Sequence, residues 1–289
     1  MNEMVPEAPG DASRAEAGPW TAPGAPGEGA AAPRRPRVAI MGEFSAGKST
    51  LSNLLLGDRA LPEKVTATQL PPIWIVRGTG DPLRVDLRGG ETPVEPARIG
   101  DVPVEETRAV RMFREAPILD RCDLIDFPGI SDPNMDPEVW ERLLPEADVV
   151  LWCTHATQAW RRSEAAAWSL VPEAVRDRSL LLVTRFDKIV TERDRARVIR
   201  RVEAEAGPLF GGVLPVSLVR ALDPGTRPES GFDAFLERLD EVLDAFAPPP
   251  SPKAEAPAEA ARVVPRRVRP RQGRQGRTAD AGGTRRVPS

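Results

Sequence analysis

The residues with the clearest chemical pattern lie between Arg37 and Gly57, in the segment RVAIMGEFSAGKSTLSNLLLG. Here Gly42, Gly47, Lys48 and Ser49 follow the spacing Gly-x-x-x-x-Gly-Lys-Ser, between an apolar run and a helix-like run. That spacing is typical of a Walker A loop, whose backbone N–H groups surround a phosphate chain. The lysine then supplies a mobile cation, and the serine hydroxyl a magnesium ligand. The alternative is a plain glycine turn between a strand and a helix.

We expect the whole loop to take part in nucleotide binding. Its residues are Gly42, Glu43, Phe44, Ser45, Ala46, Gly47, Lys48, Ser49 and Thr50.

A second motif, Asp126-Phe127-Pro128-Gly129, follows the apolar pair Leu124-Ile125. In a D-x-x-G motif at a strand end, the carboxylate can hold a magnesium-bound water and the glycine N–H can meet the terminal phosphate. Asp126 and Gly129 are therefore candidate nucleotide-site residues, and the polar segment after them could change conformation. A simple strand-ending turn is the alternative.

A third motif, Thr184-Arg185-Phe186-Asp187, follows the apolar run that begins at Leu180. Asp187 can accept two hydrogen bonds from guanine, which adenine cannot supply, so this motif favours GTP over ATP. Thr184 and Arg185 belong to the same candidate site, with the stem of Arg185 covering the base. Ser217, after the last strand, is a candidate for a backbone contact to the base. For the motif at residues 184–187, a solvated charge cluster at a helix start is the alternative.

These motifs need a sheet to position them, and short apolar runs supply its predicted strands. Their continuous hydrophobicity is typical of strands covered on both faces. Alternation with amphipathic segments predicts an α/β protein with the three-layer P-loop fold and a mostly parallel central sheet, with ligands at the carboxyl ends of the strands. The expected strands are Val38–Met41, Ile73–Val76, Leu124–Ile125, Val149–Cys153, Leu180–Thr184 and Val213–Val216.

Two helices can be bounded from the sequence. Thr191-x-x-Asp194 opens one with a capping pattern, and Gly207-Pro208 closes it. The last helix keeps apolar residues at three-four spacing from Phe232 to Phe246, which predicts packing on the sheet.

Composition divides the 289 residues into one expected domain, residues 34–247, and two tails expected to be disordered. The tail of residues 1–33 is rich in Ala, Gly and Pro and carries five acidic residues against one arginine. The tail of residues 248–289 is rich in Pro and Arg. Neither has enough apolar side chains to offset the entropy of ordering. The net charge of −3 therefore conceals an acidic and a basic end.

No apolar run has the length of a membrane span, and the first residues lack the pattern of a signal peptide. We therefore expect a cytoplasmic protein. Cys122 and Cys153 lie in apolar segments, which predicts buried thiols rather than a metal site.

Together, GEFSAGKS at residues 42–49, DFPG at 126–129 and TRFD at 184–187 resemble the dynamin superfamily, especially its bacterial members, over about residues 35–247. The resemblance covers a G domain only, because no stalk or helical bundle is evident. It implies a GTPase that uses Mg²⁺, and it implies a G-domain homodimer or a dynamin-like partner protein.

The resemblance also assigns further roles. A switch threonine would complete the magnesium shell and position the attacking water; Thr68 matches better, and Thr66 is the alternative. Ser49, Thr68 and Asp126 would then be the metal ligands, and Lys48, Ser45 and Thr68 the catalytic residues. Phe44 departs from dynamin itself, which has a glutamine there that helps to orient water, so hydrolysis could be slow or organised differently.

The leading hypothesis is a GTPase acting as a nucleotide-dependent switch or partner subunit. The first alternative is a nucleotide-gated binding module with negligible turnover. The basic tail suggests an anionic surface, such as the inner face of a membrane, with peripheral association. A nucleic-acid-associated GTPase is the weaker alternative, because that tail lacks aromatic residues for base stacking.

Overall fold

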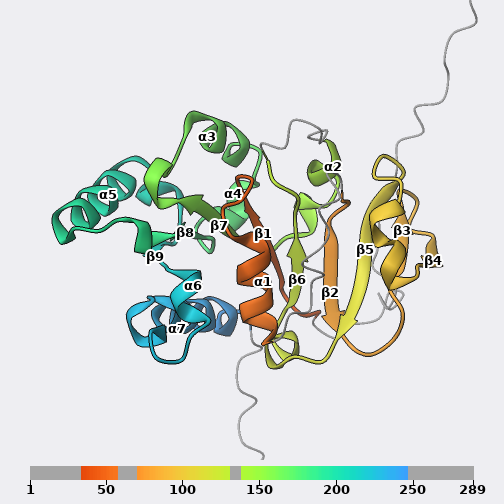
Figure 1. Cartoon of the computed structure of the whole chain (residues 1–289). Helices are drawn as coiled ribbons and strands as arrows, with labels where there is room; N and C mark the ends of the chain where they lie inside the picture. Colours follow the sequence, from red (N-terminus) through yellow and green to blue (C-terminus); the bar gives the residue numbers. More distant parts are fainter. Residues whose placement is uncertain (1–33, 58–69, 131–137, 247–289) are drawn as a thin grey trace, which may run out of the picture. The chain divides into compact units, whose positions relative to one another are not determined.

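The computed structural model describes residues 34–57, 70–130 and 138–246 of the chain. Their strands form one sheet in the order β4-β3-β5-β2-β6-β1-β7-β8-β9 (Figure 1). The strands are β1 Arg37–Gly42, β2 Ile73–Arg77, β3 Leu83–Asp86, β4 Glu91–Pro93, β5 Thr107–Arg114, β6 Asp123–Asp126, β7 Val149–His155, β8 Leu180–Thr184 and β9 Gly212–Pro215.

The centre of the sheet is parallel, as the continuous apolar runs predict. β1 lies between β6 and β7, with Val38 beside Leu124 on one side and Val149 on the other. β8 and β9 continue the parallel arrangement, whereas β2 runs antiparallel to β6 and parallel to β5. All residues of β1 are buried. Burial of both faces explains why this strand has no polar alternation.

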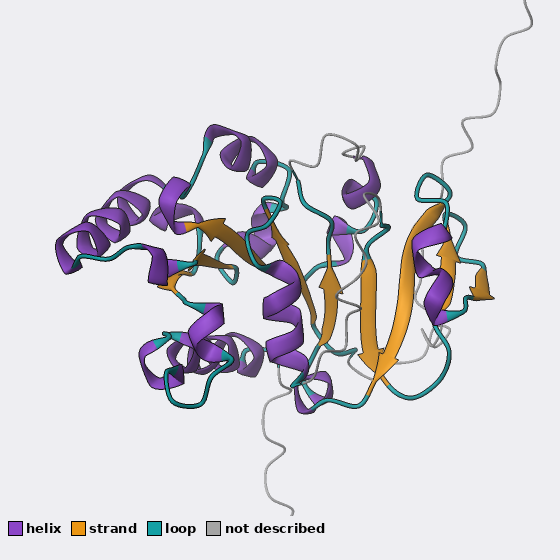
Figure 2. Cartoon of the chain, viewed as in Figure 1, coloured by secondary structure: helices purple, strands orange, loops and turns teal. Residues whose placement is uncertain are grey.

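Helices cover both faces of the sheet, which confirms the predicted three-layer α/β fold (Figure 2). Val38 and Ile40 point to the face packed by α1, α6 and α7, and Ala39 and Met41 point to the face packed by α2 to α5. The helices are α1 Lys48–Leu56, α2 Glu138–Glu141, α3 Arg162–Trp168, α4 Glu173–Arg176, α5 Glu192–Glu205, α6 Leu218–Ala221 and α7 Phe232–Asp244.

Short 3₁₀ turns complete the described elements. They are η1 Pro96–Asp101, η2 Pro117–Asp120, η3 Leu144–Glu146, η4 Ala156–Gln158, η5 Phe186–Lys188, η6 Gly207–Leu209 and η7 Arg227–Glu229.

Both helices that the sequence bounded are present. The Thr191 hydroxyl accepts a hydrogen bond from the N–H of Asp194 at 3.1 Å and so caps α5, as its capping pattern predicts. In α7, Phe232, Phe235 and Leu239 are buried in the core, which confirms its packing role. Within the described ranges, no helix has the length and apolar character needed to span a membrane.

Strands β3, β4 and β5 were not predicted. β5 pairs with β2 in parallel, and β3 and β4 extend the sheet beyond it by antiparallel pairing. β5 escapes a search for apolar runs because arginines interrupt it. The structure pairs these arginines: Arg108 with Glu146, and Arg111 with Glu91 at 2.5 Å. The guanidinium of Arg111 also lies 5.4 Å from the ring centroid of Trp74. Paired and stacked in this way, the arginines are compatible with a largely buried strand.

The fold brings the three motifs to one edge of the sheet. The first follows β1, the second ends β6 and the third follows β8, and these strands are parallel to one another through β1 and β7. Because parallel strands share their carboxyl edge, the three loops converge there.

Candidate nucleotide-binding site

The glycines of the loop at residues 42–47 have a steric reason to be glycine. Gly42 has a φ of 137°, and a Cβ placed on it would lie 2.1 Å from the carbonyl oxygen of Cys153 on β7. Gly47, with a φ of 93°, would place a Cβ 2.9 Å from the side chain of Leu218 on α6. A larger residue at position 42 would push the loop away from β7, and one at position 47 would be strained by its positive φ and would displace the Leu218 side chain.

Lys48 is buried at the start of α1 and closes the loop on itself. Its Nζ donates hydrogen bonds to the carbonyl oxygens of Gly42, at 3.1 Å, and Glu43, at 2.8 Å. Burial lowers the pKa of the Lys48 ammonium, and the nearby Asp126 carboxylate opposes that change. The neighbouring Ser49 is exposed and Thr50 is half-buried. A buried cation beside exposed hydroxyls is suited to an anionic ligand.

Asp126 is the last residue of β6 and lies near Lys48. The surroundings of its carboxylate show whether this site could bind a magnesium ion. Its Oδ1 is buried without a hydrogen-bond partner among the described residues. Burial raises the pKa of Asp126 to about 6, while Lys48 and a hydrogen bond from Ser52 act in the opposite direction. A buried carboxylate oxygen with unused acceptor capacity fits a water bound to Mg²⁺. No cluster of three His, Cys, Asp or Glu side chains suited to a metal occurs in the described parts, so the other ligands would be hydroxyls and phosphate oxygens.

Gly129 brings the second motif against the tip of the first. A Cβ on Gly129 would lie 3.0 Å from Cα and 3.1 Å from the backbone nitrogen of Phe44. The next residue, Ile130, donates its N–H to the carbonyl of Gly42 at 3.2 Å. The Phe44 side chain is 68% exposed. The two loops are therefore in direct contact, with an aromatic side chain at the surface between them.

The third motif is bonded to the first. The buried Thr184 hydroxyl donates to the carbonyl of Ala46 at 2.7 Å and to that of Thr154 at 3.0 Å. Arg185 has a left-handed backbone, with a φ of 52°, and donates from Nη2 to the carbonyl of Ser45 at 2.7 Å. These contacts fix the spacing between the loop that would bind phosphates and the loop that would bind a base.

Ser217 contributes differently from the expected backbone contact. Its own N–H is donated to the carbonyl of Ser230 at 2.8 Å, whereas its hydroxyl donates to Asp187 Oδ1 at 2.7 Å. The Ser217 side chain thus orients the carboxylate of the third motif. Leu218 begins α6, where a first-turn N–H has no partner within the helix. Leu218 is the better candidate for a backbone contact to a base.

The remaining predicted positions, Thr66 and Thr68, lie outside the described residues, as do both tails and most of the segment after Gly129. One residue in contact with the loop was not selected from the sequence. Ser163, on α3, donates to Glu43 Oε1 at 2.8 Å across 120 positions of sequence. The sequence offers no signal for so distant a pair.

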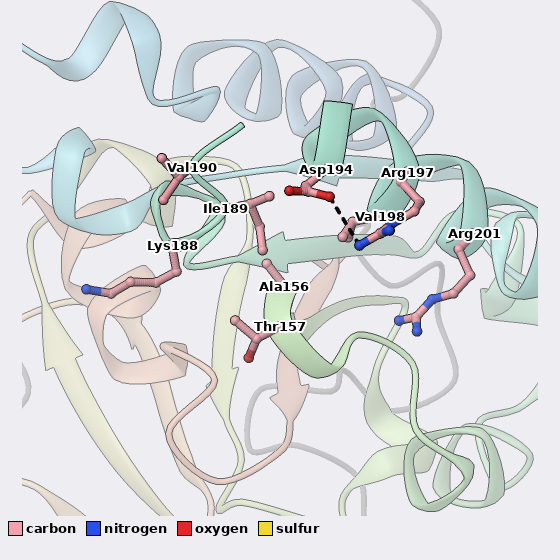
Figure 3. A pocket seen from close by; sticks show the side chains of 9 residues that line it. All are labelled: Ala156, Thr157, Lys188, Ile189, Val190, Asp194, Arg197, Val198 and Arg201. Atoms are coloured by element: carbon pink, nitrogen blue, oxygen red, sulfur yellow. Dashed lines mark ion pairs between the residues drawn. The ribbon is translucent and has the colours of Figure 1, made fainter. Parts of the chain in front are cut away.

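A cavity of about 540 Å³ adjoins the third motif (Figure 3). The turn after β7 supplies Ala156 and Thr157, and the chain after Asp187 supplies a lysine and two apolar residues. Residues Asp194, Arg197, Val198 and Arg201 of α5 complete the wall. Arg197 and Asp194 form an ion pair at 3.1 Å, drawn as the dashed line. The guanidinium of Arg201 donates to the carbonyl of Ala159 at 2.7 Å.

A glycine-rich loop between the first strand and first helix of a parallel sheet defines the class of P-loop nucleotide-binding domains. The chain belongs to the Dynamin family, whose profile matches residues 38–186.

Three similar proteins are of bacterial origin. Dynamin-like protein 2 of Campylobacter jejuni (strain 81-176) is 25% identical over 211 residues, covering 71% of this chain and 34% of that protein. The uncharacterized protein YfjP of Escherichia coli (strain K12) is 25% identical over 227 residues, covering 74% and 64%. A chain from an oligomerised bacterial dynamin pair, described as sensing and tethering membranes, matches with a TM-score of 0.54 and 16% identity over 74% of this chain and 36% of that one. This chain therefore spans only part of the length of each relative.

Proposed function

We propose that this protein binds GTP together with Mg²⁺ and hydrolyses it to GDP and phosphate. The observation that carries the proposal is the bonding of the third motif to the first. Thr184 ties the loop of residues 184–187, here called the base-side loop, to the loop of residues 42–47, here called the phosphate-side loop. Ser217 holds the Asp187 carboxylate in a defined orientation. A site built to pair both guanine nitrogens discriminates strongly against adenine, because an unpaired buried acceptor is costly.

In this proposal the chain's own groups divide the work. Lys48 exchanges its two carbonyl partners for phosphate oxygens, and the N–H groups of residues 42–47 surround them. Ser49, Asp126 and Thr68 hold the metal, with Asp126 acting through water. Bound Mg²⁺ would neutralise charge on the phosphoryl group being transferred. Gly129 meets the terminal phosphate through its N–H, and Thr68 positions the attacking water. Ser45, which matches the family serine that helps to accommodate a charge-compensating cation, would have that role here.

A second function, binding with negligible turnover, is favoured by one observation. Phe44 occupies the loop tip with an exposed ring and offers no hydrogen-bonding group to a water. A nucleotide would then order the switch segments and change a binding surface without frequent hydrolysis. The same phenylalanine is equally compatible with hydrolysis that depends on a partner.

The proposal extends to organisation and partners. Residues 34–247 form the G domain, which acts as a nucleotide-dependent switch or as one subunit of a pair. The bacterial dynamin pair supports a G-domain homodimer or a dynamin-like partner. Peripheral binding to an anionic membrane from the cytoplasmic side is supported by the nine arginines of residues 262–286. Binding of nucleic acid by these arginines is the weaker alternative.

Single-turnover release of phosphate from GTP, with and without anionic vesicles, tests the proposal. Lys48→Ala should abolish nucleotide binding or turnover while circular dichroism and thermal unfolding show a folded domain. Hydrolysis no faster than in buffer, with tight GTP binding retained, would favour the binding module. Failure of the wild-type protein to bind GTP would refute both.

A further inference from the structure

The start of α3 is held by a buried polar network that none of the three motifs includes. Glu164 is 1% exposed. Its carboxylate accepts hydrogen bonds from Trp152 Nε1 at 3.0 Å, Thr154 Oγ1 at 3.0 Å and the N–H of Arg161 at 2.9 Å. Two of these donors belong to β7, directly beside β1. The first turn of α3 is therefore fixed to the strand next to the phosphate-side loop.

The corner that leads into α3 is strained and held from two sides. Trp160 has a φ of 59°, a left-handed conformation that is costly for an aromatic residue. Its N–H donates to Thr154 Oγ1 at 3.0 Å, and Arg201 donates to the preceding carbonyl of Ala159 at 2.7 Å. Such a conformation persists only where surrounding contacts determine it, and these corners concentrate at functional sites.

This fixed turn presents one hydroxyl to the phosphate-side loop. Ser163 Oγ donates to Glu43 Oε1 at 2.8 Å. Glu43 is only 6% exposed, and its carbonyl oxygen accepts the 2.8 Å hydrogen bond from Lys48. The residue that Ser163 contacts is thus one of the two whose carbonyls bind the lysine, and it directly follows the last residue of β1.

We propose that Ser163 is a positioning residue for the phosphate-side loop, acting through Glu43. This inference rests on the proposed binding of GTP. By holding the Glu43 side chain, Ser163 keeps the loop backbone in the shape that accepts phosphates before any ligand arrives. A loop that already has the bound shape loses less conformational entropy when the nucleotide binds. Because GDP and GTP share the α- and β-phosphates that such a loop surrounds, both affinities depend on Ser163.

The test compares three variants of the full chain by equilibrium binding of GDP and GTP. Ser163→Ala removes the hydroxyl, and Ser163→Thr retains it at a position that is exposed and so tolerates an added methyl group. Ser169→Ala is the matched control, because its hydroxyl lies at the other end of α3 and bonds only locally, to the carbonyl of Ala166. Thermal unfolding and the KM and kcat of hydrolysis are measured on the same samples.

We expect Ser163→Ala to raise the Kd of both nucleotides by about three- to tenfold, the range for loss of one hydrogen bond. KM should rise by a similar factor and kcat should change less, and Ser163→Thr and Ser169→Ala should resemble the wild type. Unchanged affinities in Ser163→Ala, or an equal loss in Ser169→Ala, would overturn the positioning role. An affinity loss that Ser163→Thr does not restore would also overturn it. A wild-type protein that binds neither nucleotide would instead refute the proposed function.

Discussion

Replacing Thr184 with valine tests whether the base-side loop is tied to the phosphate-side loop. The Thr184 hydroxyl is fully buried and shares its single proton between the carbonyls of Ala46 and Thr154. Valine keeps the shape and removes the donor, which leaves two buried carbonyls short of a partner. The expected cost is about 1–3 kcal/mol in the free energy of unfolding. For a domain of this size that corresponds to a fall of roughly 2–12 °C in Tm.

Thr184→Ser supplies the control, because it keeps the hydroxyl and loses only a methyl group. Differential scanning calorimetry gives the stability of each variant, and fluorescence titration gives the affinity for GTP. We expect Thr184→Val to lose affinity as well, because the Ala46 carbonyl belongs to the phosphate-side loop. If Thr184→Val matched Thr184→Ser in both Tm and affinity, the tie between the loops would contribute nothing and the reasoning would fail.

Three further predictions use other parts of the site and the chain. In nucleotide-free protein with EDTA, the raised pKa of Asp126, about 6, means that the folded state holds this proton more tightly than the unfolded chain. The free energy of unfolding by urea should therefore fall as the pH rises from about 4 to about 6, because the folded state loses this proton. Asp126→Asn should make that dependence on pH less steep. Equal slopes in both proteins would contradict the burial argument. Ser217→Ala should weaken GDP and GTP binding by about tenfold, because the Asp187 carboxylate loses its orienting hydrogen bond. Ser217→Thr keeps the hydroxyl and should bind both nucleotides like the wild type. Isothermal titration calorimetry measures these affinities. Deleting residues 253–289 removes ten basic and three acidic residues, so salt-sensitive sedimentation with anionic vesicles should disappear while GTP hydrolysis stays within a few-fold. Retained sedimentation at low salt would place the binding surface elsewhere.

The parallel centre of the sheet was predictable because burial on both faces requires continuous apolar runs. β8 occupies Leu180–Thr184 as predicted, and β1 exceeds its prediction by one residue at each end. β5 could not be found in this way. Its arginines are neutralised by Glu146 and Glu91 from distant elements, and sequence alone does not show which acids will be nearby.

In the candidate site, too, the local features could be predicted and the long-range contacts could not. Motif spacing located the three loops, because each loop needs particular residues at fixed local distances. The contacts between loops were not predictable, since they join residues far apart in sequence: Thr184 with Ala46, and Ser163 with Glu43. A contact of Ser217 to a base stays a prediction; in the structure its hydroxyl donates to Asp187 Oδ1 and its N–H to the carbonyl of Ser230.

The central claim is that Asp187 reads guanine, and Asp187→Asn tests it most directly. An asparagine keeps the Oδ1 acceptor that Ser217 contacts, so the loop should keep its shape. Its amide can donate to the additional carbonyl of xanthine, where a carboxylate is repelled. Competition against a fluorescent nucleotide should show wild-type protein preferring GTP over xanthosine triphosphate, and Asp187→Asn losing or reversing that preference. An unchanged preference for GTP in a folded Asp187→Asn protein would contradict the account.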